Sequence, residues 1–300
     1  MRFSVWASTA QSWPDLLDLA QLADSGGWHS FYLADHFMPR TATAIDPGRP
    51  TLEATALLAA LAAATTRVRL STMVLSMTYR HPAVLANWAS GVDQISGGRL
   101  TLGIGAGWQE NEHAAYGIAL GSPKERVDRF AEGLQVIKGL LTQTATTFDG
   151  QYYRLNVAVN EPKPIQENLP ILVGASGPRM LGLVAQHADE WNTWSKPGEF
   201  RKAAEPLEAA CERLGRDPES VRRSTQAWFL LDDEPAHVRA FQARTRDMPG
   251  ISGSPRQIAE AVAVWKEEGV DEVIVRDDFL GLGHRRADNY EALWEAFAEL

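Results

Sequence analysis

The sequence predicts an α/β protein with the architecture of a TIM (β/α)8 barrel. Short apolar runs of strand length alternate with longer amphipathic runs of helical spacing, and this order repeats eight times along 300 residues. Strict alternation predicts parallel strands with right-handed crossovers, and eight such units suit a barrel better than an open doubly wound sheet. No internal repeat or low-complexity linker is visible, so we expect a single domain spanning residues 1–300.

The expected strands are apolar or alternating runs bounded by polar or glycine-rich turns. They are residues 2–7, 31–34, 68–75, 100–104, 170–174, 189–193, 222–231 and 271–275. A small hairpin is expected at residues 146–155, with its turn at Asp149-Gly150.

The expected helices follow the strands, and several begin with proline at the first helical position or with a serine capping box. They are residues 14–25, 52–64, 82–95, 123–141, a helix from 178, then 199–214, 234–246, a helix opened by Ser254 and ended by Gly269, and 288–300. Residues 248–253 are expected as a loop. The longest loops, 37–51, 105–121 and 276–287, follow the second, fourth and eighth strands, at the face where barrel enzymes keep their sites.

Composition narrows the class of protein. The formal net charge of -9 argues against nucleic-acid and anionic-membrane partners. A single cysteine, Cys211, excludes a disulfide framework, and no apolar run is long enough to span a membrane. The start of the chain lacks the layout of a signal peptide, so we expect a cytoplasmic protein.

Asp35-His36 ends the second expected strand and is the first candidate for chemistry. Successive strand residues point to opposite faces, so one of the pair can face the barrel mouth while the other braces it. A histidine near an acid is a proton donor or acceptor around neutral pH. A histidine that only hydrogen-bonds a loop is the alternative.

Glycines occupy alternate positions of the fourth expected strand, at Gly103, Gly105 and Gly107. Glycine weakens a strand, so this density makes sense if something flat must approach the backbone closely. A dinucleotide fingerprint is not supported, because the spacing is wrong and the segment after Gly107 is expected to be a loop.

Residues 174–179 follow the fifth expected strand and open a helix. Small residues at a helix N-terminus can bind a phosphate through free backbone N–H groups, and Arg179 adds a charge. A plain turn capped by Ser176 is the alternative. Glu110, Glu112 and His113 are interpreted as a solvated loop face, and we expect no metal site because no paired-histidine motif occurs.

Seven short segments, taken together and in this order, resemble the bacterial luciferase-like flavin and deazaflavin superfamily, and within it the F420-dependent oxidoreductases. They are Ala34-Asp35-His36-Phe37, Thr72-Met73-Val74-Leu75, residues 103–108 with Glu112-His113, Thr147-Phe148-Asp149-Gly150, residues 174–178, residues 188–192 and residues 269–272.

The resemblance implies an enzyme with a TIM barrel that binds coenzyme F420, or alternatively FMN, at the barrel mouth. It implies a non-proline cis peptide near Met73-Val74, His36 as the residue that exchanges a proton during hydride transfer, and Asp35 at the polar edge of the ring. The residues expected to bind the cofactor are Asp35, Met73, Val74, Ala106, Gly107, Asn111, Gly174, Ala175, Ser176, Gly177, Pro178 and Arg179.

The expected function is an F420-dependent oxidoreductase that transfers hydride between the cofactor and a small organic substrate. The alternatives are an FMN-dependent luciferase-like monooxygenase and a non-catalytic flavin-binding barrel. Arg40 and Trp108 stand where sugar-phosphate dehydrogenases of the family carry a tryptophan and an acid, which makes that activity doubtful. Arg179 and Arg276 are candidates to contact the acidic tail of F420, and the resemblance implies a homodimer.

Overall fold

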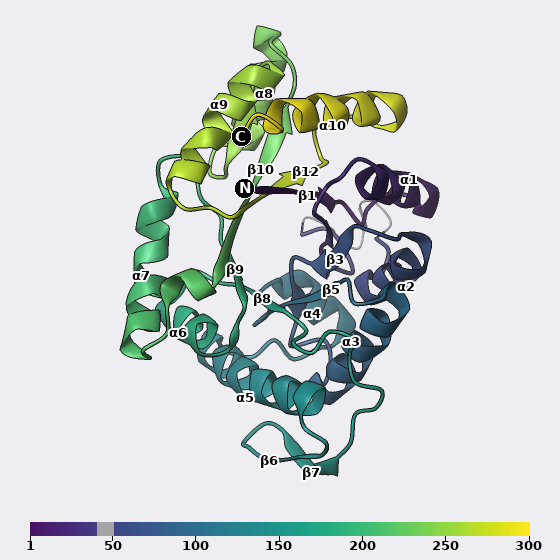
Figure 1. Ribbon diagram of the computed structural model, residues 1–300, viewed down its shortest axis with the longest axis vertical. Coiled ribbons are helices and arrows are strands. Elements are labelled where there is room, and N and C mark those ends of the chain that lie inside the picture. Colours follow the sequence, from purple (N-terminus) through teal and green to yellow (C-terminus); the bar gives the residue numbers. More distant parts are fainter. Residues whose placement is uncertain (41–50) are drawn as a thin grey trace. The chain divides into compact units, whose positions relative to one another are not determined.

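The computed structural model describes residues 1–40 and 51–300, so most of the expected loop at residues 37–51 lies outside the described residues. Strands and helices alternate along the chain, as Figure 1 shows. The chain forms two compact units. The first, called unit 1, comprises residues 1–8, 12–32 and 175–300; the second, called unit 2, comprises residues 9–11 and 33–174. A single domain over residues 1–300 stays a prediction.

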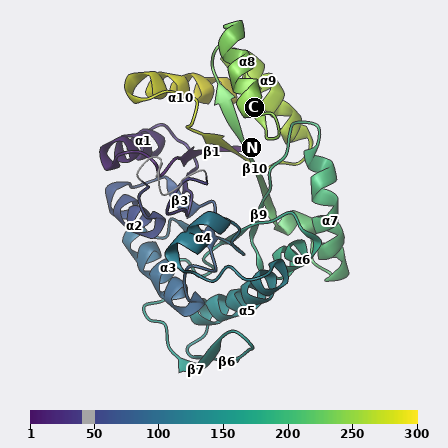
Figure 2. The ribbon, with the colours of Figure 1, turned by 180° about the vertical axis from the view of Figure 1, so that it is seen from behind.

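Unit 2 contains a parallel sheet in which β5 lies between β3 and β8, and the short strand β4 also pairs with β5. Helices α2, α3 and α5 lie side by side along this sheet in both views (Figures 1 and 2). The strands are β3 (Arg69–Thr72), β4 (Leu75–Ser76), β5 (Leu100–Gly105), the antiparallel hairpin β6 (Thr146–Asp149) and β7 (Arg154–Ala158), and β8 (Ile171–Gly174). The helices are α2 (Ala54–Ala64), α3 (Pro82–Ser96), α4 (Glu110–Tyr116) and α5 (Pro123–Thr142).

Unit 1 contains a second set of parallel strands, in which β12 lies between β1 and β10. Strand β10 also pairs with β9 and β11, and β2 pairs with β1. The strands are β1 (Arg2–Ala7), β2 (Ser30–Leu33, which ends in unit 2), β9 (Glu190–Asn192), β10 (Arg222–Leu230), β11 (Gly250–Ser252) and β12 (Glu272–Arg276). The helices are α1 (Trp13–Ser25), α6 (Pro178–His187), α7 (Phe200–Arg213), the 3-10 helix η1 (Pro218–Ser220), α8 (Pro235–Arg244), α9 (Pro255–Glu267) and α10 (Gly283–Phe297).

The expected fold class, an α/β TIM (β/α)8 barrel, is confirmed by this order of parallel strands and helices. The capping boxes predicted at Ser122 and Ser254 are both formed. Most predicted element bounds agree with the structure to within a few residues.

Four local expectations were wrong. Part of the expected loop 105–121 is helix α4, and the expected loop 248–253 contains strand β11. Helix α10 begins at Gly283, earlier than the expected residue 288, and the expected strand 68–75 is interrupted after Thr72. The two missed elements are short, so their own sequence shows little periodicity, and their contacts with distant segments decide their conformation.

Two of the alternating glycines of β5 pack against the end of β3 and the residues that follow it. A Cβ atom at Gly103 would lie 1.9 Å from the carbonyl oxygen of Thr72. A Cβ at Gly105 would lie 2.7 Å from Val74 Cγ2. Neighbouring protein therefore already requires glycine at both positions, and a close approach by a flat ring stays a prediction.

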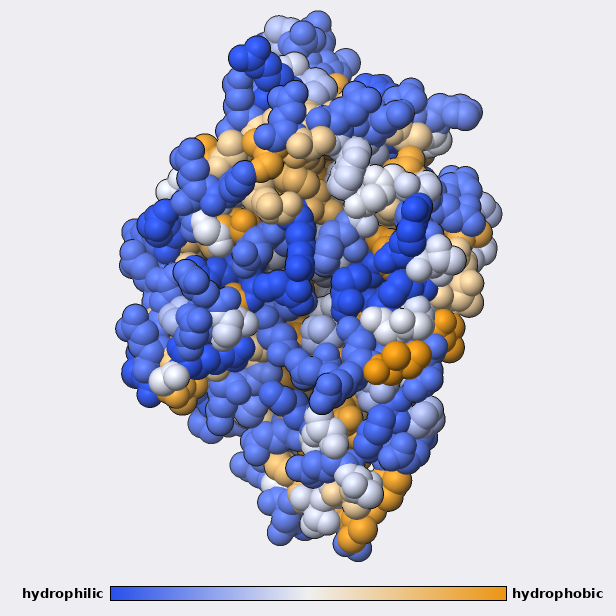
Figure 3. Space-filling model, viewed as in Figure 1, coloured by the Kyte–Doolittle hydropathy of each residue, from blue (hydrophilic) through white to orange (hydrophobic). Residues whose placement is uncertain are grey.

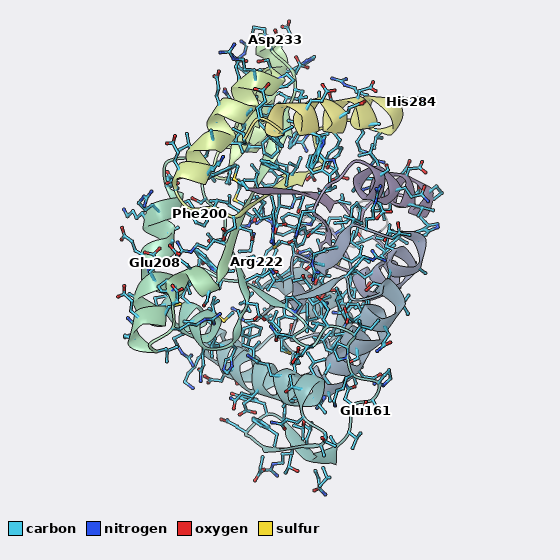
Figure 4. All side chains as sticks on the ribbon, in the orientation of Figure 1. Glu161, Phe200, Glu208, Arg222, Asp233 and His284 are labelled. Atoms are coloured by element: carbon cyan, nitrogen blue, oxygen red, sulfur yellow. The ribbon has the colours of Figure 1, made fainter. Side chains whose placement is uncertain are left out.

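A buried polar cluster lies within unit 1 around Glu272. Glu272 Oε1 accepts hydrogen bonds from Ser4 Oγ at 2.5 Å and from the Tyr32 hydroxyl at 3.0 Å. Burial, followed by repulsion from Glu190, raises the pKa of Glu272 to about 7 and outweighs these hydrogen bonds. Glu190 in turn pairs with Arg222, which Figure 4 labels on β10.

In the part of the chain that the structure describes, no helix is both long and apolar enough to cross a membrane. Hydrophilic side chains cover most of the face drawn in Figure 3, with apolar residues in small groups.

We expect Gly103→Ala to lower the free energy of unfolding by about 3 kcal/mol or more, because the new methyl group would collide with rigid backbone. Gly91→Ala is the matched control, since a Cβ at Gly91 has nothing within 4 Å inside α3. The control should raise stability by up to about 1 kcal/mol, because alanine favours a helix over glycine. Urea denaturation measures both, and a Gly103→Ala variant as stable as the parent protein would contradict the packing argument.

We expect Glu272→Gln to gain stability over the parent protein as pH rises. The pKa of Glu272 is raised in the folded state, so the folded chain binds more protons than the unfolded chain between the two pKa values. The stabilising effect of protonation is complete at low pH and is lost as pH rises through about 7. Glutamine keeps the acceptor oxygen and does not titrate, so its relative gain should be on the order of 1–3 kcal/mol between about pH 5 and about pH 8. Denaturation curves test this, with exposed Glu260→Gln as the control, and parallel curves for the variant and the parent would refute it.

Candidate active site

A histidine–glutamate pair lies at the centre of the candidate site in unit 2. His36 follows β2, and its Nδ1 lies 2.7 Å from Oε1 of Glu112 on α4. The Glu112 side chain is fully buried, whereas the His36 side chain is 29% exposed. A carboxylate accepts a hydrogen bond, so Nδ1 carries the proton in the neutral ring and Nε2 holds the lone pair. The pair can therefore accept or donate a proton at Nε2.

Helix α4 also holds the backbone that follows His36. Glu112 Oε2 accepts from the backbone N–H of Phe37 at 2.8 Å. Gln109 Nε2 donates to the carbonyl of Met38 at 3.0 Å, and Asn111 Nδ2 donates to that of Pro39 at 3.1 Å. Residues 37–39 are thus each bonded to a side chain of α4 or of its N-cap, Gln109.

Tyr79 completes the surroundings of Glu112. Burial raises the pKa of Glu112, but hydrogen bonds from His36, Tyr79 and the Phe37 N–H outweigh burial and lower that pKa below its usual value. Burial and the charge of Glu112 raise the pKa of Tyr79 in turn. The ring of Tyr79 packs against Phe37 with centroids 4.6 Å apart. Glu112 is therefore held ionised, as an acceptor from three donors.

Asp35 is bound by protein groups on both carboxylate oxygens. Arg80 Nη1 and Nη2 donate to Oδ2 and Oδ1 at 2.7 and 2.9 Å, and the Ser76 N–H donates to Oδ2 at 2.8 Å. Arg80 also pairs with Glu53. Burial lowers the pKa of Arg80, but its bonds to Asp35 and Glu53 raise it overall. Asp35 is only 3% exposed, so its observed role is to hold the segment from Ser76 to Arg80.

A second histidine, His113, takes part in a separate chain of hydrogen bonds. His113 Nδ1 lies 2.6 Å from the carbonyl oxygen of Gln109, so Nδ1 donates and Nε2 accepts from Thr78 Oγ1 at 2.7 Å. Thr78 lies 2.7 Å from Ser76 Oγ. Both ring nitrogens of His113 are used inside the protein and its residue is 2% exposed, so the geometry gives it a structural role.

The expected cofactor residues of unit 2 adjoin these groups in sequence and in space. The Met73–Val74 peptide is cis, as the resemblance implied. Ala106 and Gly107 are half-buried, and Gly107 has a φ of +85° beside Ser76 and Thr78. Asn111 Oδ1 is buried and has no hydrogen-bond partner among the described residues. A buried acceptor without a donor is unfavourable, so Asn111 fits a ligand that presents an N–H or O–H group.

The expected phosphate turn begins at Gly174, at the end of β8, and continues into unit 1. The backbone N–H of Ala175 donates to the carbonyl of Asn192 at 3.1 Å, and Trp191 Nε1 donates to the carbonyl of Ala175 at 2.9 Å. Gly177, not Ser176, is the N-cap of α6, and it makes no side-chain cap. Ser176, Gly177, Pro178 and Arg179 are exposed. This is a helix start open to solvent, and phosphate binding there stays a prediction.

The expectation that Glu110, Glu112 and His113 form a solvated loop face was wrong for two of the three. Only Glu110 is exposed, whereas Glu112 and His113 are buried by their partners. Sequence reasoning missed Glu112, Arg80, Tyr79 and Glu53 as site residues. The signal available was the pair Glu112-His113 within a resemblance motif. Among residues 1–40 and 51–300, no cluster of His, Cys, Asp and Glu is suited to a metal ion.

The chain is similar to F420-dependent enzymes and to monooxygenases. The F420-dependent glucose-6-phosphate dehydrogenase of Nakamurella multipartita is 36% identical over 264 residues, which cover 86% of this chain and 75% of the relative. The structure of an F420-dependent secondary alcohol dehydrogenase in complex with an F420-acetone adduct has a TM-score of 0.85 at 21% identity, covering 99% of this chain and 98% of that one. The EDTA monooxygenase from Chelativorans sp. BNC1 has a TM-score of 0.83 at 17% identity, covering 100% and 92%.

The two solved structures have the same barrel fold as this chain. The Nakamurella relative aligns with 86% of this chain. Residues 1–247 match the general sequence pattern of the luciferase-like monooxygenase family. The chain is therefore a member of the luciferase-like monooxygenase family.

Proposed function

We propose that this protein is an F420-dependent oxidoreductase that transfers hydride between F420 and a small organic substrate. The observation that carries the proposal is the His36–Glu112 pair, with Nδ1 and Oε1 2.7 Å apart and Nε2 left for a proton. The named activity of the Nakamurella relative supports F420 as the cofactor. Reduction or oxidation of a carbonyl or alcohol by hydride needs a matching proton transfer, and this pair can supply it.

In the proposed mechanism, Glu112 holds the His36 ring in place through its hydrogen bond with Nδ1. Nε2 of His36 donates a proton to a substrate oxygen during reduction, or accepts one during oxidation. Arg80 neutralises Asp35 and keeps the chain from Ser76 to Arg80 in place. The carboxylate of Glu112 stays ionised because His36, Phe37 and Tyr79 all donate to it.

The residues present fit the cofactor. The orphaned buried oxygen of Asn111 would accept from a polar edge of the ring, and Ala106 and Gly107 would offer backbone beside it. Met73 and Val74 would lie behind the ring, and Asp35 would support that part of the chain through its bond to the Ser76 N–H. Separately, residues 174–179 would offer an anion site at the uncapped start of α6. When bound, F420 supplies or accepts the hydride.

The second candidate is an FMN-dependent monooxygenase, favoured by the fold shared with the EDTA monooxygenase. A non-catalytic flavin-binding barrel is less favoured, because such a protein has no need of a buried carboxylate that orients a half-exposed histidine. We also propose a homodimer in the cytoplasm that binds neither nucleic acid nor membrane.

Titration of the purified protein with F420 and with FMN, followed by tryptophan fluorescence, tests the cofactor. We expect F420 to bind with a dissociation constant on the order of 1–10 μM, which corresponds to a binding free energy of about −7 to −8 kcal/mol. FMN should bind at least about tenfold more weakly, because it lacks the acidic tail that Arg179 could contact. Preferential binding of FMN would instead favour the monooxygenase.

Two variants separate the roles of the paired residues. His36→Ala should lower kcat by about 10²–10⁴-fold, because it removes the proton-transfer group. Glu112→Gln keeps the acceptor oxygen but removes the charge, and should lower kcat by about 10–100-fold. F420 affinity should change by less than about threefold in both, since neither residue is proposed to bind the cofactor.

Glu110→Gln is the matched control, because Glu110 lies on the same helix but is exposed. It should leave kcat unchanged. Full activity in His36→Ala with normal F420 binding would remove His36 from the mechanism and leave the cofactor assignment intact.

A further inference from the structure

Three tryptophans and one arginine form a cluster within unit 1, here called the Trp–Arg cluster. Trp6, Trp228 and Arg276 are register partners on β1, β10 and β12, and Trp194 follows β9. All four stand near the carboxyl ends of their strands, which is the end where barrel enzymes bind substrates. None of the four belongs to the His36–Glu112 pair or to the expected phosphate turn.

The arginine is enclosed by the aromatic rings. The guanidinium carbon of Arg276 lies 4.1 Å from the ring centroid of Trp6 and 5.0 Å from that of Trp228. Trp194 stacks on Trp228, with centroids 5.1 Å apart and planes 28° apart. A cation at these distances is attracted by the ring faces, so Arg276 is fixed in place.

Asp278 balances the charge of the cluster. Its Oδ2 accepts from Arg276 Nε at 2.8 Å and from Trp228 Nε1 at 3.0 Å. This carboxylate removes most of the attraction that Arg276 would exert on an anion. It also makes Arg276 a poor candidate for the acidic tail of F420, contrary to the sequence-based expectation.

The cluster leaves hydrogen-bonding capacity unused. Among the described residues, only Nε of Arg276 is bonded, so both Nη groups remain available as donors. Gln226 points to the same face of β10 as Trp228, two residues earlier, and is 1% exposed. Its Oε1 has no partner in the described part of the chain. Trp194 is 36% exposed and offers a flat surface to a ligand.

We propose that the Trp–Arg cluster binds a flat, uncharged aromatic compound that carries a carbonyl group and a hydroxyl group. The ring stacks on Trp194, the carbonyl oxygen accepts from the Nη groups of Arg276, and the hydroxyl group donates to Oε1 of Gln226. Stacking on an aromatic side chain favours a flat ring over a saturated ring of similar size.

Charged ligands fit less well. A carboxylate would meet Asp278 on the same guanidinium, and like charges at that range oppose binding. A cation would be repelled by Arg276, which already occupies the face of Trp6. An uncharged ligand therefore fits the cluster better than an anion or a cation.

Binding of para-hydroxyacetophenone, para-hydroxybenzoate and cyclohexyl methyl ketone to the full chain without cofactor tests the proposal by calorimetry. We expect the aromatic ketone to bind at least about fivefold more tightly than either the benzoate or the saturated ketone. Trp194→Leu should weaken the aromatic ketone by at least about fivefold, whereas Trp294→Leu, a half-buried tryptophan of the same unit that packs on Trp28, should not.

Asp278→Asn is expected to increase the affinity for the benzoate. Loss of folding could not produce that result. With the carboxylate removed, the benzoate should bind at least about tenfold more tightly than it binds the parent protein, while the ketone changes little. Equal affinity for ketone and benzoate in the parent protein would overturn the proposal. So would unchanged ketone binding in Trp194→Leu, or no binding of any of the three compounds. Because no cofactor is present, these outcomes are separate from the fate of the F420 proposal.

Discussion

The buried carboxylate of Glu112 is the group on which the candidate site depends. A carboxylate with no solvent contact is costly unless hydrogen bonds satisfy it, and here His36, the Phe37 N–H and Tyr79 do so. Each of those donors comes from a segment outside α4. Satisfying one charge therefore positions the proton-transfer ring, the start of the loop after β2 and the aromatic side chain beside it.

The β3–β4 segment next to this site packs closely because two residues of β5 have no side chain. Gly103 and Gly105 leave space that Thr72 and Val74 fill, and Asp35 accepts a hydrogen bond from the Ser76 N–H just after them. Close packing of this kind leaves the β3–β4 segment little freedom to move. Packing inside the protein therefore explains why glycine occupies these positions, whether or not a ring approaches the backbone.

The Trp–Arg cluster follows a different principle. Arg276 and Asp278 neutralise one another, and the aromatic rings then provide shape without net charge. A site of this kind discriminates by planarity and by hydrogen bonds, whereas the His36–Glu112 pair is suited to proton transfer. The family provides the fold and the general chemistry, and clusters at strand ends give each barrel its own ligand preference.

The amino-acid sequence by itself determined the alternation of strands and helices, the barrel class, the capped helix starts and His36 as the candidate for chemistry. These features depend on local periodicity and on residues adjacent in the chain, such as Ser122 with Glu125. Tertiary structure alone decided that Glu112 pairs with His36, that Asp35 is bonded to Arg80, and that Arg276 lies among tryptophans. Those contacts join residues far apart in the sequence, and whether a polar side chain is solvated or buried depends on which distant donor comes within hydrogen-bond distance.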